Sequence, residues 1–204
     1  MSEYFVPAGS GEAEFVEKRS SFLGHVRFAG TEDAAREFIN DMKKKHYDAR
    51  HNCWCYIIRG GAVRYSDDGE PQGTAGIPVL SVLRASEVSD AVVTVTRYFG
   101  GILLGASGLL RAYTTAASEA VHAAGIVTYV IFDELRLTVS YSDRQRLETL
   151  LHGDGIKLDG SDFGTDVVLT LAVKADLTAG FLRSVDDRCS GRARVERLGS
   201  RYDA

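Results

Sequence analysis

The sequence predicts an α+β protein of two domains, residues 1–133 and 134–204. In the first part, short apolar stretches with the two-residue period of strands alternate with segments that have the helical period. In the second part, about 70 residues accommodate the order strand–helix–strand–strand–helix–strand, which is the ferredoxin-like arrangement. The 204 residues, 45% of them hydrophobic, are enough for two small cores.

Composition places the chain among cytoplasmic globular proteins. It contains three cysteines and carries a formal net charge of −4. So few cysteines do not form a disulfide framework, which indicates a reducing compartment. No apolar run reaches the roughly 18 residues of a membrane span, and the N-terminus lacks a signal-peptide pattern. We therefore expect no membrane partner, and neither half has the basic excess of a strong nucleic-acid binder.

The first domain is predicted to begin with two strands, near 12–17 and 22–28. Thr31 fits the N-cap of a helix that ends in three lysines. The further elements are a hairpin turning at Gly60-Gly61, a helix over 78–84, a strand over 90–99 buried on both faces, and a long helix ended by Gly125.

The second domain is predicted to start with a strand in which Leu135, Leu137, Val139 and Tyr141 share one face. Ser142 and Gln145 have the spacing of a capping box for the helix that follows. The remaining elements are strands over 156–163 and 166–174, a helix from Leu177 to Val185, and a last strand over 192–198.

Four glycines separate the buried strand from the long helix: Gly100, Gly101, Gly105 and Gly108. Two interpretations stand. The free N–H groups of the helix start bind an anion, or the missing side chains let helix and sheet pack closely. The spacing matches neither the dinucleotide fingerprint nor the phosphate loop, and the loop has no lysine. Close packing, with Gly105 and Gly108 against the sheet, is therefore favoured over nucleotide binding.

Asp67, Asp68 and Glu70 surround Gly69 in the stretch "SDDGEP". Three neighbouring carboxylates can hold a divalent ion, but Asp-Gly and Glu-Pro are also turn dipeptides, and the turn is favoured. A charged residue at the end of a buried strand needs a partner. We therefore predict an ion pair between Arg97 and one of these carboxylates.

His51, Cys53 and Cys55 alternate along a predicted strand and share one face. Zinc knuckles use a different spacing, and no fourth ligand is evident. Two small thiols in the core are the favoured interpretation. Neither cysteine, nor Ser66 or Ser107, has the surroundings of a nucleophile, so we predict no catalytic residue, no metal and no cofactor.

Three stretches, "HYDARHNCWCY", "YSDDGEPQGTAGIPVL" and "TRYFGGILLGASGLLRAY", resemble the YigZ/IMPACT family. The resemblance covers the whole chain and implies an N-terminal ribosomal-protein-type α/β domain similar to domain IV of elongation factor G. It implies a ferredoxin-like second domain similar to domain V of that factor. Eukaryotic relatives regulate translation during amino-acid starvation, partly through a further domain that this chain lacks. Bacterial relatives often have lysine after Thr-Ala-Gly, where this sequence has Ile77, so a phosphate contact by that lysine would be missing here.

These observations favour a non-enzymatic regulatory protein that binds RNA, the ribosome or a translation factor. The predicted binding surface consists of His51, Asp67, Asp68, Glu70, Arg97, Gly100, Gly101 and Gly105. In this hypothesis Arg97 contacts a phosphate or an acidic group, the carboxylates hold Arg97, and the glycines allow close approach. The alternatives are a metal-assisted hydrolase using the acidic loop with His51 as base, and a protein–protein module acting through the C-terminal sheet. The oligomeric state is left open.

Overall fold

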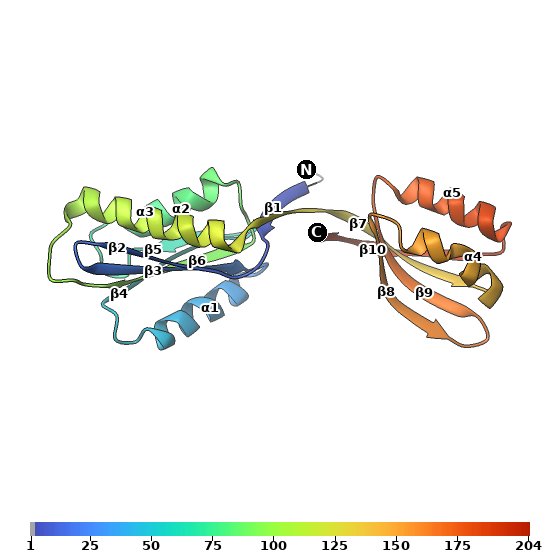
Figure 1. Cartoon of the computed structure of the whole chain (residues 1–204), viewed down its shortest axis with the longest axis horizontal. Coiled ribbons are helices and arrows are strands. Elements are labelled where there is room, and N and C mark those ends of the chain that lie inside the picture. The colour runs from blue at the N-terminus through green and yellow to red at the C-terminus, as the bar shows by residue number, and fades with distance from the viewer. Residues whose placement is uncertain (1–2) are drawn as a thin grey trace. The chain divides into compact units, whose positions relative to one another are not determined.

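The computed structural model describes residues 3–204, which form two compact units, Tyr4–Thr128 and Tyr129–Ala204 together with Glu3 (Figure 1). The described residues contain five helices and two sheets, so the predicted α+β class is confirmed. The chain passes from one unit to the other within β7 (Ile126–Val139), and the predicted boundary at residue 133 also falls inside this strand. None of the helices in 3–204 is long and apolar enough to cross a bilayer.

The sheet of the first unit has the strand order β2-β3-β6-β4-β5, and all its pairs are antiparallel. The bounds are β2 Gly11–Glu17, β3 Ser20–Phe28, β4 His51–Ile57, β5 Val63–Ser66 and β6 Ala91–Tyr98. β6 lies in the centre, and its residues from Ala91 to Arg97 are buried, which confirms the prediction of burial on both faces. Arg97 is the last buried residue of this strand, which ends at Tyr98 just before the glycine loop.

Helices cover both faces of this sheet: α1 (Glu32–Lys45) lies on one face, and α2 (Gly76–Ala85) and α3 (Gly105–Ala124) lie on the other (Figure 1). Thr31 caps α1 as predicted, since its hydroxyl accepts a hydrogen bond from the backbone N–H of Ala34 at 3.2 Å. Gly125 is the C-terminal cap of α3, also as predicted.

Close packing of α3 on the sheet depends on glycines in the strands. A Cβ at Gly24 would lie 2.3 Å from the carbonyl oxygen of Ala116, and one at Gly11 would lie 2.1 Å from that of Ala120. The prediction that Gly105 and Gly108 provide this approach is wrong. A Cβ at Gly105 would meet nothing within 4 Å, and one at Gly108 would meet only the side chain of Leu104.

The second unit contains the predicted strand–helix–strand–strand–helix–strand order. Its elements are β7, α4 (Tyr141–Leu151), β8 (Ile156–Phe163), β9 (Val167–Lys174), α5 (Thr178–Cys189) and β10 (Arg194–Asp203). The antiparallel strands have the order β10-β7-β9-β8, and β1 (Glu3–Pro7) also pairs with β7. α4 and α5 pack on the same hydrophobic core as β7 and β9.

The predicted capping box at Ser142 is wrong, because α4 begins earlier. Ser140 is the N-cap, and its Oγ accepts a hydrogen bond from the backbone N–H of Asp143 at 3.1 Å. Tyr141 is therefore the first residue of the helix and does not continue the alternation of β7. Two serines two positions apart both fit the sequence rule, and only the exact end of the strand decides between them.

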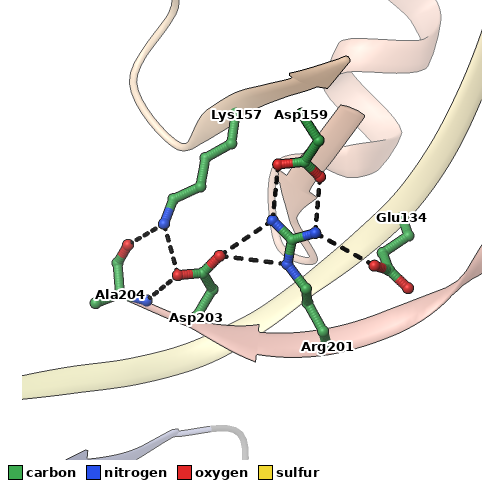
Figure 2. A network of polar contacts seen from close by, with 6 residues as sticks. All are labelled: Glu134, Lys157, Asp159, Arg201, Asp203 and Ala204. Carbon is green, nitrogen blue, oxygen red and sulfur yellow. Dashed lines mark hydrogen bonds and ion pairs between the residues drawn. The ribbon is translucent and has the colours of Figure 1, made fainter. Parts of the chain in front are cut away.

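A polar network holds the end of β10 against β7 and β8 (Figure 2). The Arg201 guanidinium donates to both carboxylate oxygens of Asp159, at 2.7 and 2.9 Å, and to Glu134 at 3.3 Å. Lys157 Nζ lies 2.7 Å from Asp203 Oδ1. The charges of this cluster are paired, and they fix the last strand of the chain to the sheet.

Candidate functional site

A cleft of about 390 Å³ opens where the acidic loop, the end of β6 and the start of α3 meet. We call it the α3 cleft. Its lining residues are Arg50, His51, Gly69, Glu70, Pro71, Arg97, Phe99, Leu103, Leu104, Gly105, Ala106 and Leu109. Four residues singled out from the sequence (His51, Glu70, Arg97 and Gly105) thus line the same cleft, although 54 positions separate the first from the last.

The predicted ion pair between Arg97 and the acidic loop is present, and Glu70 is the partner. Arg97 Nη1 donates to Glu70 Oε1 at 2.7 Å, and the two side chains are only 7% and 3% exposed. Tyr113 Oη donates to the same oxygen at 2.9 Å, and burial raises the pKa of Tyr113, so its hydroxyl remains a donor. Two donors thus hold a buried carboxylate at the floor of the cleft.

Arg97 retains unused hydrogen-bonding capacity. Within residues 3–204 its Nη1 has a partner, whereas its Nε is buried and has none. A guanidinium has five N–H donors in a fixed plane. Arg97 is therefore a cation held in place by Glu70, with donors that no residue within 3–204 uses.

His51 has a defined orientation beside this pair. Its Nδ1 lies 2.8 Å from the carbonyl oxygen of Asp68, and because a carbonyl only accepts, Nδ1 carries the proton. Its Nε2 lies 4.0 Å from Glu70 Oε1. In the neutral ring, Nε2 is then a hydrogen-bond acceptor at the wall of the cleft.

Asp67 and Asp68 do not line the cleft. The Asp67 carboxylate accepts hydrogen bonds from the backbone N–H groups of Gly73, Ala75 and Gly76, at 2.9, 3.0 and 2.8 Å, and so orders the start of α2. Asp68 accepts from Lys43 Nζ and from the backbone N–H of Asn52, each at 2.8 Å. The acidic loop is the turn that the dipeptides indicated.

The three carboxylates therefore have three different sets of partners. In the described part of the chain, no group of three or more His, Cys, Asp or Glu side chains is arranged to hold a metal ion. The ligand set that the metal-assisted hydrolase would need is not assembled there. Asp67 and Asp68 support the loop, and Glu70 alone reaches the cleft.

The glycines of the loop have separate roles. A Cβ at Gly100 would lie 2.1 Å from the backbone of Arg19, so Gly100 allows the loop to pack on the turn between β2 and β3. Gly101 has a φ of +83° and no neighbour within 4 Å of a Cβ position. Gly105, with a φ of +70°, leaves open space at the cleft wall. Gly69 lines the cleft as well, and the sequence did not single it out.

The start of α3 is an uncapped helix end within the cleft. Its N-cap is Leu104, which makes no side-chain cap, and the first turn contains no acidic residue. The first N–H groups of a helix have no intrahelical partner and carry partial positive charge. Gly105 and Ala106, the first two residues of α3, line the cleft, so these groups lie beside it.

Basic side chains surround this helix end. Arg50 is exposed, lines the cleft and forms no ion pair within residues 3–204. A neighbouring hollow of about 180 Å³, which shares Leu104 with the cleft, is lined by Lys18 and Arg111, with Glu17 as its acidic residue. We call it the basic hollow. The near-neutral composition conceals this local concentration of positive charge, because its members come from four separate segments.

Part of the cleft lining is apolar. Phe99 is 43% exposed and Leu103 is 84% exposed, and Pro71 lies with them. The Arg97 guanidinium carbon lies 5.4 Å from the centroid of the Phe99 ring. Phe99, Leu103 and Pro71 were not predicted from the sequence, although the apolar residues on either side of Gly100-Gly101 in "FGGILLG" were a signal for the first two.

Cys53 and Cys55 are fully buried core residues, as predicted. Burial raises the pKa of both thiols, so neither is a thiolate near neutral pH. Cys53 Sγ lies 3.0 Å from the carbonyl oxygen of Asp67, beneath the acidic loop.

The fold and the site define a two-unit α+β protein with a cleft that combines a buried guanidinium, a helix N-terminus and an apolar wall. The model of the Impact N-terminal domain matches residues 18–121, and that of a domain of unknown function, DUF1949, matches residues 137–192. The chain belongs to the IMPACT family, which confirms the resemblance seen in the sequence. The match to the N-terminal model includes every residue that lines the α3 cleft.

Relatives of similar length support this assignment. The IMPACT family member YvyE of Bacillus subtilis (strain 168) is 34% identical over 198 residues, covering 96% of this chain and 91% of the relative. The IMPACT family member YigZ of Escherichia coli (strain K12) is 32% identical over 197 residues, covering 94% and 96%. A solved structure described as a crystal structure of a hypothetical protein matches with a TM-score of 0.64 and 31% identity, covering 96% of this chain and 97% of that one.

A eukaryotic relative matches over less of the chain. The protein IMPACT homolog of Dictyostelium discoideum is 35% identical over 95 residues, which are 44% of this chain and 27% of the relative. Most of that protein therefore has no counterpart here.

Proposed function

We propose that this chain is a non-enzymatic, cytoplasmic, translation-associated regulatory protein that binds RNA, including ribosomal RNA, at the α3 cleft. The observation that carries the proposal is the uncapped start of α3, with Arg97, which Glu70 holds in place, and Arg50, which has no ion pair among the described residues, beside it. Lys18 and Arg111 extend this positive surface into the basic hollow.

These groups are the ones that bind phosphates. Arginine and lysine side chains, backbone N–H groups and helix N-termini make most protein contacts to the nucleic-acid backbone. Because the protein carries a net charge of −4, RNA approaches it favourably only at such a local basic surface. Binding through a few phosphates is therefore expected to be moderate in affinity and dependent on salt.

The family supports the link to translation, since the eukaryotic relatives that the sequence resembles regulate translation. The proposed likeness of the two units to domains IV and V of elongation factor G points in the same direction, as an analogy between folds. The metal-assisted hydrolase is not favoured, because Asp67 and Asp68 are engaged in the loop itself.

The test is co-sedimentation with ribosomes at about 50 mM and about 200 mM salt. We expect the wild type to associate at low salt and to dissociate in part at the higher salt. A variant with Lys18→Ala, Arg50→Ala and Arg111→Ala loses three phosphate contacts, so the slope of log K against log salt falls by about 2 for single-stranded contacts.

The matched control has the same change in net charge at exposed arginines outside the cleft and the hollow: Arg64→Ala, Arg183→Ala and Arg194→Ala. It is expected to bind as the wild type does. The absence of association at both salt concentrations, or an equal loss in the two triple variants, would overturn the proposal. Retention on ribosomes stripped of RNA would instead indicate a protein partner such as a translation factor.

A further inference from the structure

We infer that the α3 cleft holds one unstacked nucleotide, with its base on Phe99 and its phosphate at the start of α3. This inference rests on the proposed function and specifies the form of RNA that the site recognises. The chemistry is shared by a free nucleotide and by a nucleotide within a single-stranded segment, and the experiment distinguishes these two sources.

The lining of the cleft contains two kinds of group, which favours a ligand with two different parts. Phe99, Leu103 and Pro71 are apolar. Arg50, Arg97 and the first N–H groups of α3 supply hydrogen-bond donors and positive charge. A simple anion leaves the apolar side chains exposed to water, and an apolar ligand leaves the donors unsatisfied. A flat base joined to a phosphate has a partner for both kinds of group.

The size of the cleft excludes a stacked base pair. Its volume of about 390 Å³ is in the range of clefts that hold single small molecules. The bases of a duplex are stacked and paired inside the helix, so they cannot enter a cleft of this kind. A base from a loop, a bulge or a single-stranded segment can be turned outwards and inserted.

Phe99 provides the stacking surface. It is 43% exposed, and Arg97 approaches its ring to 5.4 Å, which fixes the ring beside the buried ion pair. An exposed aromatic ring in a soluble domain, held by a cation and adjacent to positive charge, is the arrangement that proteins use to stack single-stranded bases. Leu103, which is 84% exposed, extends the apolar contact at the rim.

Two independent features provide the phosphate site. The start of α3 has neither a side-chain cap nor an acidic residue in its first turn, and Gly105 leaves space for close approach. In addition, Arg97 lines the cleft although it is only 6% exposed, and its hydrogen bond to Glu70 uses Nη1, so the guanidinium keeps donors that have no partner within residues 3–204. The adjacent basic hollow, with Lys18 and Arg111, is then placed to receive the next phosphate of the strand.

The experiment measures fluorescence anisotropy of a labelled single-stranded RNA of eight nucleotides and of the same sequence as a duplex, with the full chain. We expect tighter binding of the single strand, and a loss of affinity of about 5- to 150-fold for Phe99→Ala, which is the usual contribution of one stacked base. Phe99→Trp, which retains an aromatic face, is expected to bind more tightly than Phe99→Ala. Tyr65→Ala removes a 47% exposed aromatic residue on β5 and serves as the control.

A second variant does not depend on removing a partly buried ring. Leu103→Asp places a carboxylate at the rim, and because Leu103 is 84% exposed, the fold tolerates it. We expect it to weaken single-strand binding at low salt through repulsion of the phosphate.

A competition experiment distinguishes the two ligands. A nucleoside monophosphate that fully displaces the RNA, and binds as tightly as the RNA does, would identify a free nucleotide as the ligand of the cleft.

Equal binding of single strand and duplex, or equal affinity of Phe99→Ala and the wild type, would overturn the inference. Ribosome association that persists in Phe99→Ala but is lost in the triple basic variant would overturn the base site while leaving the proposed function intact. We expect the triple basic variant to lose both ribosome association and binding of the single-stranded RNA. We expect Phe99→Ala to lose affinity for the single strand and not for the duplex.

Discussion

Replacing Glu70 by alanine is expected to destabilise the first unit strongly. Arg97 would remain buried, with 7% of its side chain exposed, and would lose the carboxylate 2.7 Å away. Tyr113 would lose its acceptor at 2.9 Å. Breaking a buried pair by removing one partner costs about 3–5 kcal/mol, a range that already includes the effect on neighbouring donors. We therefore expect a loss of about 4 kcal/mol, and a melting temperature lower by roughly 10–20 °C.

Trp54 provides a readout that is specific to this unit. It is the one tryptophan of the chain and lies on β4, so its fluorescence during urea unfolding reports the first unit separately from the second. Glu119→Ala, an exposed position on α3, is the control and is expected to change stability by less than about 0.5 kcal/mol.

A second variant separates the charge from the contact. Glu70→Leu combined with Arg97→Met removes both charges. Because burying the ion pair costs desolvation free energy that offsets its attraction, the double variant is expected to recover most of the stability lost in Glu70→Leu. A loss below about 1 kcal/mol in Glu70→Ala, or additive losses in the double variant, would refute the view that the two groups form one buried unit.

Three further predictions concern stability. Burial lowers the pKa of His25 from its ordinary value of 6.5, so the unfolded chain binds the proton more readily than the folded one. The first unit should therefore lose stability as the pH falls below about 6.5. His25→Gln should make unfolding, followed by Trp54 fluorescence, depend less on pH. Ser140→Ala is expected to cost about 1 kcal/mol by removing the cap of α4, whereas Ser142→Ala should cost less than half as much in urea unfolding followed by circular dichroism. Arg201→Ala, which breaks the network at the end of β10, should increase amide exchange in that strand, whereas breaking the exposed pair of Arg136 with its neighbour on β10 should not.

Local rules predicted the parts of the fold that depend on neighbouring residues. Thr31 caps α1 and Gly125 ends α3 because both effects act within a few residues. The partner of Arg97 was predictable for a different reason, since a buried charge must be compensated and the acidic loop was the obvious source. The sequence did not reveal which of the three carboxylates would be the partner, because that choice depends on how the loop is placed relative to Arg97 on β6.

Residues that act over long sequence distances could not be predicted in this way. Lys18 and Arg111 line the basic hollow and Arg50 lines the α3 cleft, and the two adjoin at Leu104 through the packing of α3 on the sheet that contains β3 and β4. Gly11 and Gly24 resemble ordinary strand residues until α3 is placed on them, with its carbonyls at distances that exclude a Cβ. The proposed binding surface therefore depends on the tertiary fold, and the charge pattern along the chain does not predict it.

The most direct test of the account is a crystal structure of the full chain with a short single-stranded RNA. We predict a phosphate within hydrogen-bond distance of the N–H of Gly105 or Ala106 and of the Arg50 side chain, with the attached base against Phe99. RNA bound to another surface, with the α3 cleft unoccupied, would contradict it.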